Sequence, residues 1–130
     1  MPHVNEEIAR KATQALSKGD MQTFIGLHND DVVLHFPGRG PLAGDYKGKD
    51  GLVRLFQKQM EMLDSPPQIE NHDILASDDH VAALVTVRAE RDDRRAEWKS
   101  IDLFHVRDGR LSEHWVHEVD QGAVDRFFAS

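Results

Sequence analysis

The sequence contains no cysteine. This absence excludes disulfide bonds, cysteine-ligated zinc sites, iron–sulfur clusters and a cysteine nucleophile. The sequence also has no apolar run close to the roughly 20 residues that a membrane-spanning helix needs. Its first residues have neither the basic nor the apolar region of a secretory signal. Since chains without disulfides suit a reducing compartment, we expect a cytoplasmic protein with no membrane partner.

Basic residues are outnumbered in this chain. It holds 16 Lys and Arg against 23 Asp and Glu, which gives a net charge of −7 at pH 7. The basic residues form no tract that interleaves with aromatic residues. Phosphate backbones and anionic membrane surfaces repel such a chain. We therefore expect no nucleic-acid partner.

What the sequence does contain is typical of one folded globular unit. Of its 130 residues, 39% are hydrophobic and 30% are charged, a balance that argues against intrinsic disorder. A chain of this length buries roughly two-thirds of its unfolded surface, so it needs neither a metal nor a disulfide to stay folded. We expect residues 1–130 to form a single domain.

The hydrophobic pattern predicts helices early in the chain and strands in its second half. We expect helices over about 6–17, 20–27, 50–63 and 121–128, and strands over 32–36, 68–76, 80–91, 94–107 and 110–119. The loop over 37–49 holds four glycines and two prolines, so we expect no regular structure there. Tight hairpins make neighbouring strands antiparallel. The order α-α-β-α-β-β-β-β-α then predicts an α+β fold, with helices covering one face of a curved antiparallel sheet.

Capping residues support three of these helices. Asn5, Asp20 and Asp50 precede apolar periodic segments and are the expected N-caps. Gly19 can end the first helix in a left-handed conformation.

The strands over 80–87 and 101–106 lack the clean alternation of a half-solvated strand. Both place apolar side chains at odd and even positions, which is typical of strands covered on two faces. We expect the helices to cover one face and a second copy of the chain to cover the other, giving a homodimer. The alternative is a monomer with an apolar outer sheet, which soluble proteins tolerate poorly.

Four segments resemble one known family along nearly the whole chain. They are ALSKGD at 15–20, PLAGDYKG at 41–48, FHVRDGRLSEHW at 104–115 and DQGAVDRFF at 120–128. In these segments and in its layout, the chain resembles the SnoaL-like branch of the nuclear transport factor 2-like superfamily. The resemblance implies a cone, in which a curved antiparallel sheet wraps around helices and leaves an apolar pocket at its open end. Members include ketosteroid isomerases, polyketide cyclases, epoxide hydrolases, dehydratases and non-catalytic binding modules, so fold alone does not fix activity.

Asp102 is the first candidate catalytic residue, because it interrupts the apolar segment 101–104. A carboxyl among apolar side chains tends to have a raised pKa. When protonated it can donate to an enolate oxygen, and when ionised it can act as a base. The resemblance implies the same role, since ketosteroid isomerases place an oxyanion-hole Asp after Ile on this strand. The alternative is an exposed or structural carboxylate, paired with Arg88, Arg94 or Arg95.

The sequence departs from the isomerase pattern at two other positions. The base of the isomerases corresponds to Phe36, which precedes Pro37, and their tyrosine on the first helix falls near Ala12. The isomerase triad is therefore absent. His35 is a reserve catalytic candidate, although strand alternation places it on the opposite face from Phe36.

His114 is the second catalytic candidate, and the strand register decides its role. If a three-residue loop with a bulge at Gly109 joins the last two strands, Asp102 lies directly across from His114 and the two share a face. If the loop has two residues, Asp102 faces Trp115 instead. A third alternative is a packed or surface histidine without a functional role.

Aromatic side chains and one further histidine are candidates for the pocket wall, because flat hydrophobic ligands suit aromatic walls. Ordinary core or dimer packing is the alternative for these residues. The expected ligand-binding residues are Phe36, Tyr46, Trp98, Phe104, Trp115 and His117.

The eight histidines do not form a recognisable metal motif such as HExxH, and the glycine-rich segments do not match a phosphate-binding loop. We therefore expect no metal and no cofactor. The sequence predicts a small enzyme that transfers protons on a hydrophobic cyclic carbonyl compound, as an isomerase, aldol-type cyclase or dehydratase. The alternatives are a binding module for a small apolar ligand, or a dimeric interaction protein of the same fold.

Overall fold

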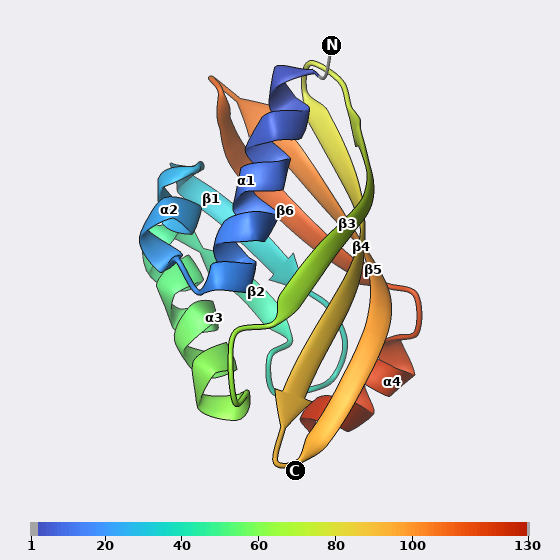
Figure 1. Ribbon diagram of the computed structural model, residues 1–130. Coiled ribbons are helices and arrows are strands. Elements are labelled where there is room, and N and C mark those ends of the chain that lie inside the picture. The colour runs from blue at the N-terminus through green and yellow to red at the C-terminus, as the bar shows by residue number, and fades with distance from the viewer. Residues whose placement is uncertain (1–2, 130) are drawn as a thin grey trace.

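The computed structural model describes residues 3–129, and Figure 1 shows a curved sheet with helices packed against one face. The helices are α1 (Val4–Lys18), α2 (Met21–Gly26), α3 (Gly48–Met62) and α4 (Gln121–Phe128). The strands are β1 (His28–Phe36), β2 (Gly44–Lys47), β3 (Gln68–Ala76), β4 (His80–Arg91), β5 (Arg94–Arg107) and β6 (Arg110–Glu118). The expected α+β class is confirmed.

The six strands form one sheet in the order β2-β1-β6-β5-β4-β3. The hairpins β3–β4, β4–β5 and β5–β6 are antiparallel, as expected. Strand β1 runs parallel to β6, which the long connection between them permits. The expectation of an irregular loop over 37–49 is wrong in its second half. Residues 44–47 pair with the end of β1 as the short edge strand β2, and α3 begins directly after it.

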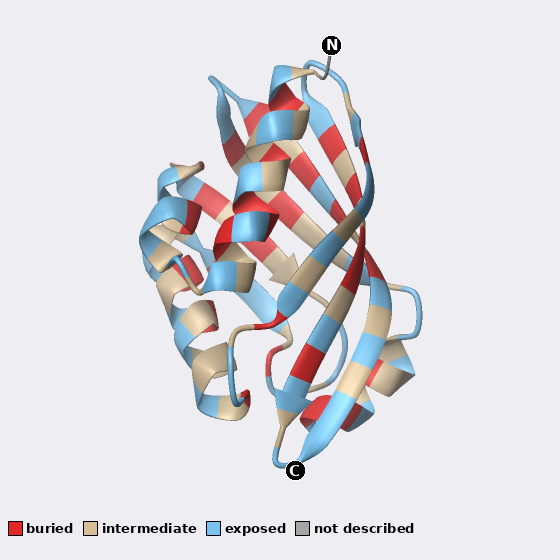
Figure 2. Ribbon diagram, viewed as in Figure 1, coloured by how far each residue is buried: buried red, intermediate tan, exposed pale blue. Residues whose placement is uncertain are grey.

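The core lies between the inner face of the sheet and the helices. Helix α1 packs on β3, α3 packs on β1 and β2, and α4 lies at one end against β5 and β6. Figure 2 shows buried and more exposed residues alternating along the strands, as expected when one face meets the helices. Along β5, Ser100, Asp102, Phe104 and Val106 are buried, and they therefore point inward.

The helix ends follow the predicted capping chemistry in part. Gly19 ends α1 with a φ of 70°, and the side chain of Asp20 accepts a hydrogen bond from the Thr23 amide at the start of α2. The Asn5 cap is wrong, because His3 caps α1 by accepting from the Asn5 amide. Asn5 is buried instead.

The third predicted cap is also wrong. Helix α3 starts two residues before Asp50, and its N-cap Lys47 makes no side-chain capping bond. Asp50 lies in the first turn of the helix, where a negative charge still favours the helix dipole.

The β5–β6 hairpin has a register that the sequence did not reveal. Its turn has two residues, Asp108 and Gly109, with φ of 54° and 75°, as a type I′ turn requires. A bulge then inserts Ser112 into β6, so Val106 pairs with Leu111 but His105 pairs with Glu113. Both registers considered above are therefore wrong. Asp102 pairs with Val116, and Phe104 pairs with His114.

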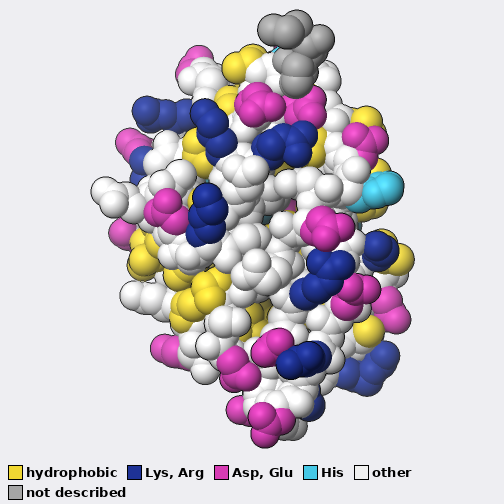
Figure 3. Space-filling view, in the orientation of Figure 1, with side chains coloured by type: hydrophobic (Ala, Val, Ile, Leu, Met, Phe, Trp, Pro, Cys, Tyr) yellow, Lys and Arg dark blue, Asp and Glu magenta, His cyan; other side chains and the backbone are white. Residues whose placement is uncertain are grey.

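The surface over α1 and α3 carries charges of both signs. Figure 3 shows Lys and Arg side chains interspersed with Asp and Glu on this face, without a continuous basic patch. Within residues 3–129, no helix is both long enough and apolar enough to span a membrane.

Candidate functional site

A cavity lies between the inner face of the sheet and the helices. Side chains from α1, α2 and α3 form its apolar wall, among them Leu16, Phe24, Leu52 and Phe56. Its volume is about 80 Å³, several times the roughly 10–15 Å³ that one water molecule needs. The cavity therefore has room for a small ring compound.

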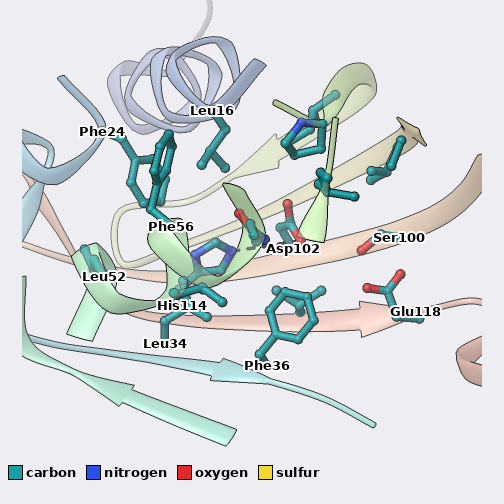
Figure 4. Close-up of a pocket in the computed structure, with 18 of the residues that line it drawn as sticks. Leu16, Phe24, Leu34, Phe36, Leu52, Phe56, Ser100, Asp102, His114 and Glu118 are labelled. Carbon is teal, nitrogen blue, oxygen red and sulfur yellow. Dashed lines mark ion pairs between the residues drawn. The ribbon is translucent and has the colours of Figure 1, made fainter. Parts of the chain in front are cut away.

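The opposite wall is polar and belongs to the β5–β6 hairpin. Ser100 and Asp102 on β5 and His114 and Glu118 on β6 all line the cavity. Figure 4 shows Asp102 and His114 together in the middle of the view, with Ser100 and Glu118 together on the side away from Leu52. The strands place all four side chains on one face because the bulge precedes His114 and alternation is regular beyond it.

Asp102 and His114 form the central pair. The distance from His114 Nε2 to Asp102 Oδ1 is 3.9 Å, and their side chains are only 4% and 10% exposed, respectively. The two residues are diagonal neighbours rather than direct partners, and such neighbours still share a face. The alternative pairing of Asp102 with arginine is not found, because Arg88 pairs with Glu70 and Glu97.

The other two arginines considered as partners also point elsewhere. Arg95 pairs with Glu90, and Arg94 lies over the Phe127 ring.

The His114 ring is buried against apolar neighbours. Its centroid lies 4.1 Å from that of the Phe104 ring, and neither ring nitrogen has a hydrogen-bond partner among residues 3–129. A buried polar atom without a partner costs about 1–3 kcal/mol. Such an atom is therefore a candidate for contact with a ligand.

His28 is a second buried histidine near this wall, and the sequence analysis missed its burial. It is fully buried, and its Nδ1 lies 2.7 Å from the Phe24 carbonyl oxygen, to which it donates. Burial is the main cause that lowers the pKa of His28 to about 4, and the charge of His114 lowers it further. His28 is therefore neutral at physiological pH.

Glu118 is a cavity residue that the sequence analysis did not select. Burial, followed by the negative charge of Asp102, raises the pKa of Glu118 to about 7, although the neighbouring Ser100 hydroxyl opposes the shift. Its Oε2 atom has no hydrogen-bond partner among the described residues. The spacing of Glu118 from His114 could have identified it from the sequence, since residues four apart on a regular strand share a face.

Two of the six expected ligand-binding residues line this cavity. Phe36 lies at the end of β1, and Trp98 lies on β5 next to the rings of Phe127 and Phe128 on α4. Phe104 is buried behind the His114 ring rather than in the cavity wall.

Tyr46 also lies outside this cavity, contrary to expectation. It is buried in β2, where its hydroxyl donates to the Leu42 carbonyl oxygen at 2.7 Å. Strand β2 is an edge strand beyond β1, so Tyr46 packs against α3 instead.

The other expected site residues point to the outer face of the sheet. Trp115 and His117 alternate with His114 and Val116 along β6, so they line a groove on the far side. His35 is on that side too, stacked on Trp115 with ring centroids 5.4 Å apart. The structure therefore does not bring His35 to Asp102 and His114.

His35 is held between two carboxylates. Its Nδ1 lies 2.7 Å from Asp45 and its Nε2 lies 2.7 Å from Glu113. Burial alone would lower the pKa of His35, but Glu113 and then Asp45 outweigh burial and raise it. This arrangement gives His35 a structural role that joins β1, β2 and β6.

Among residues 3–129, no group of three or more His, Asp or Glu side chains is arranged to hold a metal ion. Asp120 caps α4 by accepting from the Ala123 amide.

The chain has the fold of a nuclear transport factor 2-like protein of Burkholderia pseudomallei, whose structure has a TM-score of 0.90 at 17% identity. The SnoaL-like domain family matches residues 9–114 of the chain. The chain belongs to the SnoaL-like family.

Three further proteins are similar to this chain. An uncharacterised protein of Mycobacterium tuberculosis is 25% identical over 124 residues, 95% of each chain. The structure of Bal32a from a soil-derived mobile gene cassette has a TM-score of 0.91 at 28% identity, covering 97% of both chains. The structure of TerC co-crystallised with polyporic acid has a TM-score of 0.88 at 16% identity, covering 98% of this chain and 100% of TerC. The similarity to TerC shows the fold alone.

Proposed function

We propose that the chain is a small cofactor-independent enzyme that transfers a proton next to the carbonyl group of a hydrophobic cyclic compound. Isomerisation, aldol-type cyclisation and dehydration are the reactions of this class. The observation that carries the proposal is the buried Asp102–His114 pair, 3.9 Å apart, on the polar wall of a cavity whose lining is mostly apolar.

The pair has the chemistry that such a step needs. A base takes a proton from the carbon next to the carbonyl, and an acid or hydrogen-bond donor stabilises the negative oxygen of the resulting enolate. A neutral histidine carries one N–H donor and one acceptor nitrogen, and a carboxylate is an acceptor only. Asp102 and His114 together therefore supply the base and the oxyanion donor, and the proton returns to the product from the same pair.

The apolar remainder of the cavity supports the class of ligand. The cavity that holds the pair is also lined by Leu16, Phe24, Leu52, Phe56 and Trp98, and such walls bind hydrophobic rings. One fold neighbour, TerC, was crystallised with polyporic acid, which supports a small organic ligand for this cavity as well.

The test follows proton exchange rather than overall turnover. The purified protein is incubated in D₂O with cyclic ketones, and NMR measures loss of the hydrogens next to the carbonyl. We expect exchange above the uncatalysed rate, with Asp102→Asn and His114→Gln each slowing it at least about 100-fold, the usual contribution of acid–base catalysis. The exposed histidine in His80→Gln is the matched control and should leave exchange unchanged.

Binding is measured separately by thermal unfolding against steroids, aromatic polyketides, terpenoid epoxides and fatty acids. A ligand at a hundred times its dissociation constant stabilises a protein by about 2.7 kcal/mol. Binding by the wild-type protein without any proton exchange would support a binding module instead of an enzyme. No binding across the panel would support an interaction protein.

We also propose that the chain forms a homodimer through the outer face of the sheet. Leu75 and Leu103 are exposed on this face, beside Trp115. The groove between them is lined by apolar residues, one serine and three histidines, without Asp or Glu. In a chain of net charge −7, this is a face on which two copies repel each other little, so a second copy is the occupant that fits it.

A further inference from the structure

Ser100 and Glu118 form a polar pair at one end of the cavity, separate from Asp102 and His114. They face each other directly across the β5–β6 ladder, whereas Asp102 faces the apolar Val116. Figure 4 shows the Ser100 and Glu118 side chains together, to one side of the Asp102–His114 pair. The polar wall therefore has two hydrogen-bonding stations along its length.

We propose that the Ser100–Glu118 station binds a second oxygen atom of the ligand, so that the substrate is an uncharged cyclic ketone carrying another oxygen function across its ring. This inference rests on the proposed function, which assigns the carbonyl group to Asp102 and His114.

Two oxygen atoms at this station are left for a ligand, although the Ser100 hydroxyl lies close enough to Glu118 to lower its pKa somewhat. Ser100 is 3% exposed, and both Ser100 Oγ and Glu118 Oε2 are buried without a hydrogen-bond partner among residues 3–129. Glu118 has no cationic partner either, because the side chains that shift its pKa are Asp102, Ser100 and Asp125. Two unpartnered oxygens that face each other in a cavity are placed to bind a ligand group.

The charge of the cavity selects against anions. Two carboxyl groups and one imidazole line it, and among the described residues no Lys or Arg does. A ligand carboxylate or phosphate would meet Asp102 and Glu118 without a compensating cation. Burial also favours the protonated form of Glu118 and raises its pKa to about 7. A protonated carboxyl donates a hydrogen bond, so it suits an ether or carbonyl oxygen that can only accept.

The spacing of the stations sets the size of the ligand. Ser100 and Asp102 are two residues apart on one strand, which separates them by roughly 6–7 Å. This is about the span of one six-membered ring with substituents at opposite ends.

The experiment compares two ligands of equal shape, 4-methoxycyclohexanone and 4-ethylcyclohexanone, of which only the first has the second oxygen. Their dissociation constants are measured by NMR titration at pH 6 and pH 8.5. We expect the methoxy compound to bind about three- to tenfold tighter at pH 6, as expected for one net hydrogen bond. At pH 8.5 Glu118 is ionised and cannot donate, so the preference should fall at least threefold.

Three variants locate the effect. Glu118→Leu should remove the preference, and Glu118→Gln should retain it and make it independent of pH, because an amide donates at either pH. Ser100→Ala should weaken it. The control is Glu97→Gln on the outer face of β5, which pairs with Arg88 and should leave the preference intact.

Two outcomes overturn the inference. Tighter binding of the ethyl compound by the wild-type protein would show that the station does not recognise oxygen. Tightest binding of a cation, 4-oxocyclohexylammonium, would show that the cavity selects positive charge. Deuterium exchange of the same ketones keeps the two proposals apart. A methoxy preference without exchange retains the station and rejects the enzyme, and exchange without the preference does the reverse.

Discussion

At the residue scale, buried polar side chains distinguish this cavity from an ordinary core. His114 and Ser100 are each 3% exposed, yet their polar side-chain atoms have no partners among residues 3–129. Burying these groups without a hydrogen-bond partner lowers the stability of the folded protein, because their desolvation is not compensated. Residues that lower stability in this way are candidates for function, because a ligand can supply the missing partner.

His28 makes stability depend on pH. Its pKa falls from 6.5 to about 4 on folding, so the unfolded state takes up the proton first as the pH decreases. Its contribution to stability is therefore complete above pH 6.5 and is lost as the pH falls toward 4. The difference between the pKa values of His28 in the unfolded and folded states corresponds to about 3 kcal/mol of stability.

We expect His28→Gln to weaken this pH dependence by an amount of that order. Urea unfolding between pH 4 and pH 7.5 measures it. His72→Gln, at an exposed position on β3, is the control and should keep the wild-type slope. An unchanged slope in His28→Gln would contradict the assignment of the acid sensitivity to His28.

At the scale of elements, the packing of α3 on β2 depends on one glycine. A Cβ atom at Gly51 would lie 2.7 Å from the backbone carbonyl carbon of Tyr46, closer than real contacts allow. Because that neighbour is backbone, the helix has to move away from the strand. The close approach explains why a residue with poor helix propensity lies inside α3.

Gly51→Ala should therefore destabilise the protein by about 1–3 kcal/mol, although alanine by itself favours a helix by up to about 1 kcal/mol. The matched control is Gly26→Ala in α2, where the added atom meets nothing within 4 Å. That change should be neutral or stabilising. Denaturant midpoints measure both, and equal effects in the two variants would show that the close contact does not matter.

At the scale of the whole molecule, the sheet has one face toward the helices and the other toward solvent. The outer face combines Leu75, Leu103 and Trp115 with several histidines. If a second copy covers it, one charged substitution in its centre should separate the two copies.

We expect the wild-type protein to sediment as a dimer and Leu103→Glu to sediment as a monomer. Val119→Glu is the control, since Val119 is 70% exposed against 36% for Leu103 but does not line the groove that contains Leu75, Leu103 and Trp115. Analytical ultracentrifugation measures all three. A monomeric wild-type protein would reject the dimer, and dissociation by Val119→Glu would place the interface elsewhere.

Much of the fold could be predicted from local patterns. Helices α1, α3 and α4 and strands β3 to β6 lie within a few residues of their expected ranges, because periodicity and turn residues act locally. Strand β2 was missed because its four residues pair with β1 only after the chain has folded back, and because Gly44 at its start is typical of a loop. The cap by His3 was missed because the buried Asn5 is recruited by a loop more than 70 residues away.

The candidate site likewise could be predicted only in part from the sequence. The residue types, with Asp102 in an apolar strand and His114 on its neighbour, follow from the amino-acid sequence alone, as does the outward position of His35 by alternation. Only the tertiary structure decides which of these side chains lie next to one another. The Ser112 bulge shifts β6 by one residue, brings His114 and Glu118 to the face of Asp102, and turns Trp115 and His117 away. The position of a bulge depends on how two strands pair across a curved sheet. The residues of one strand alone therefore do not predict it.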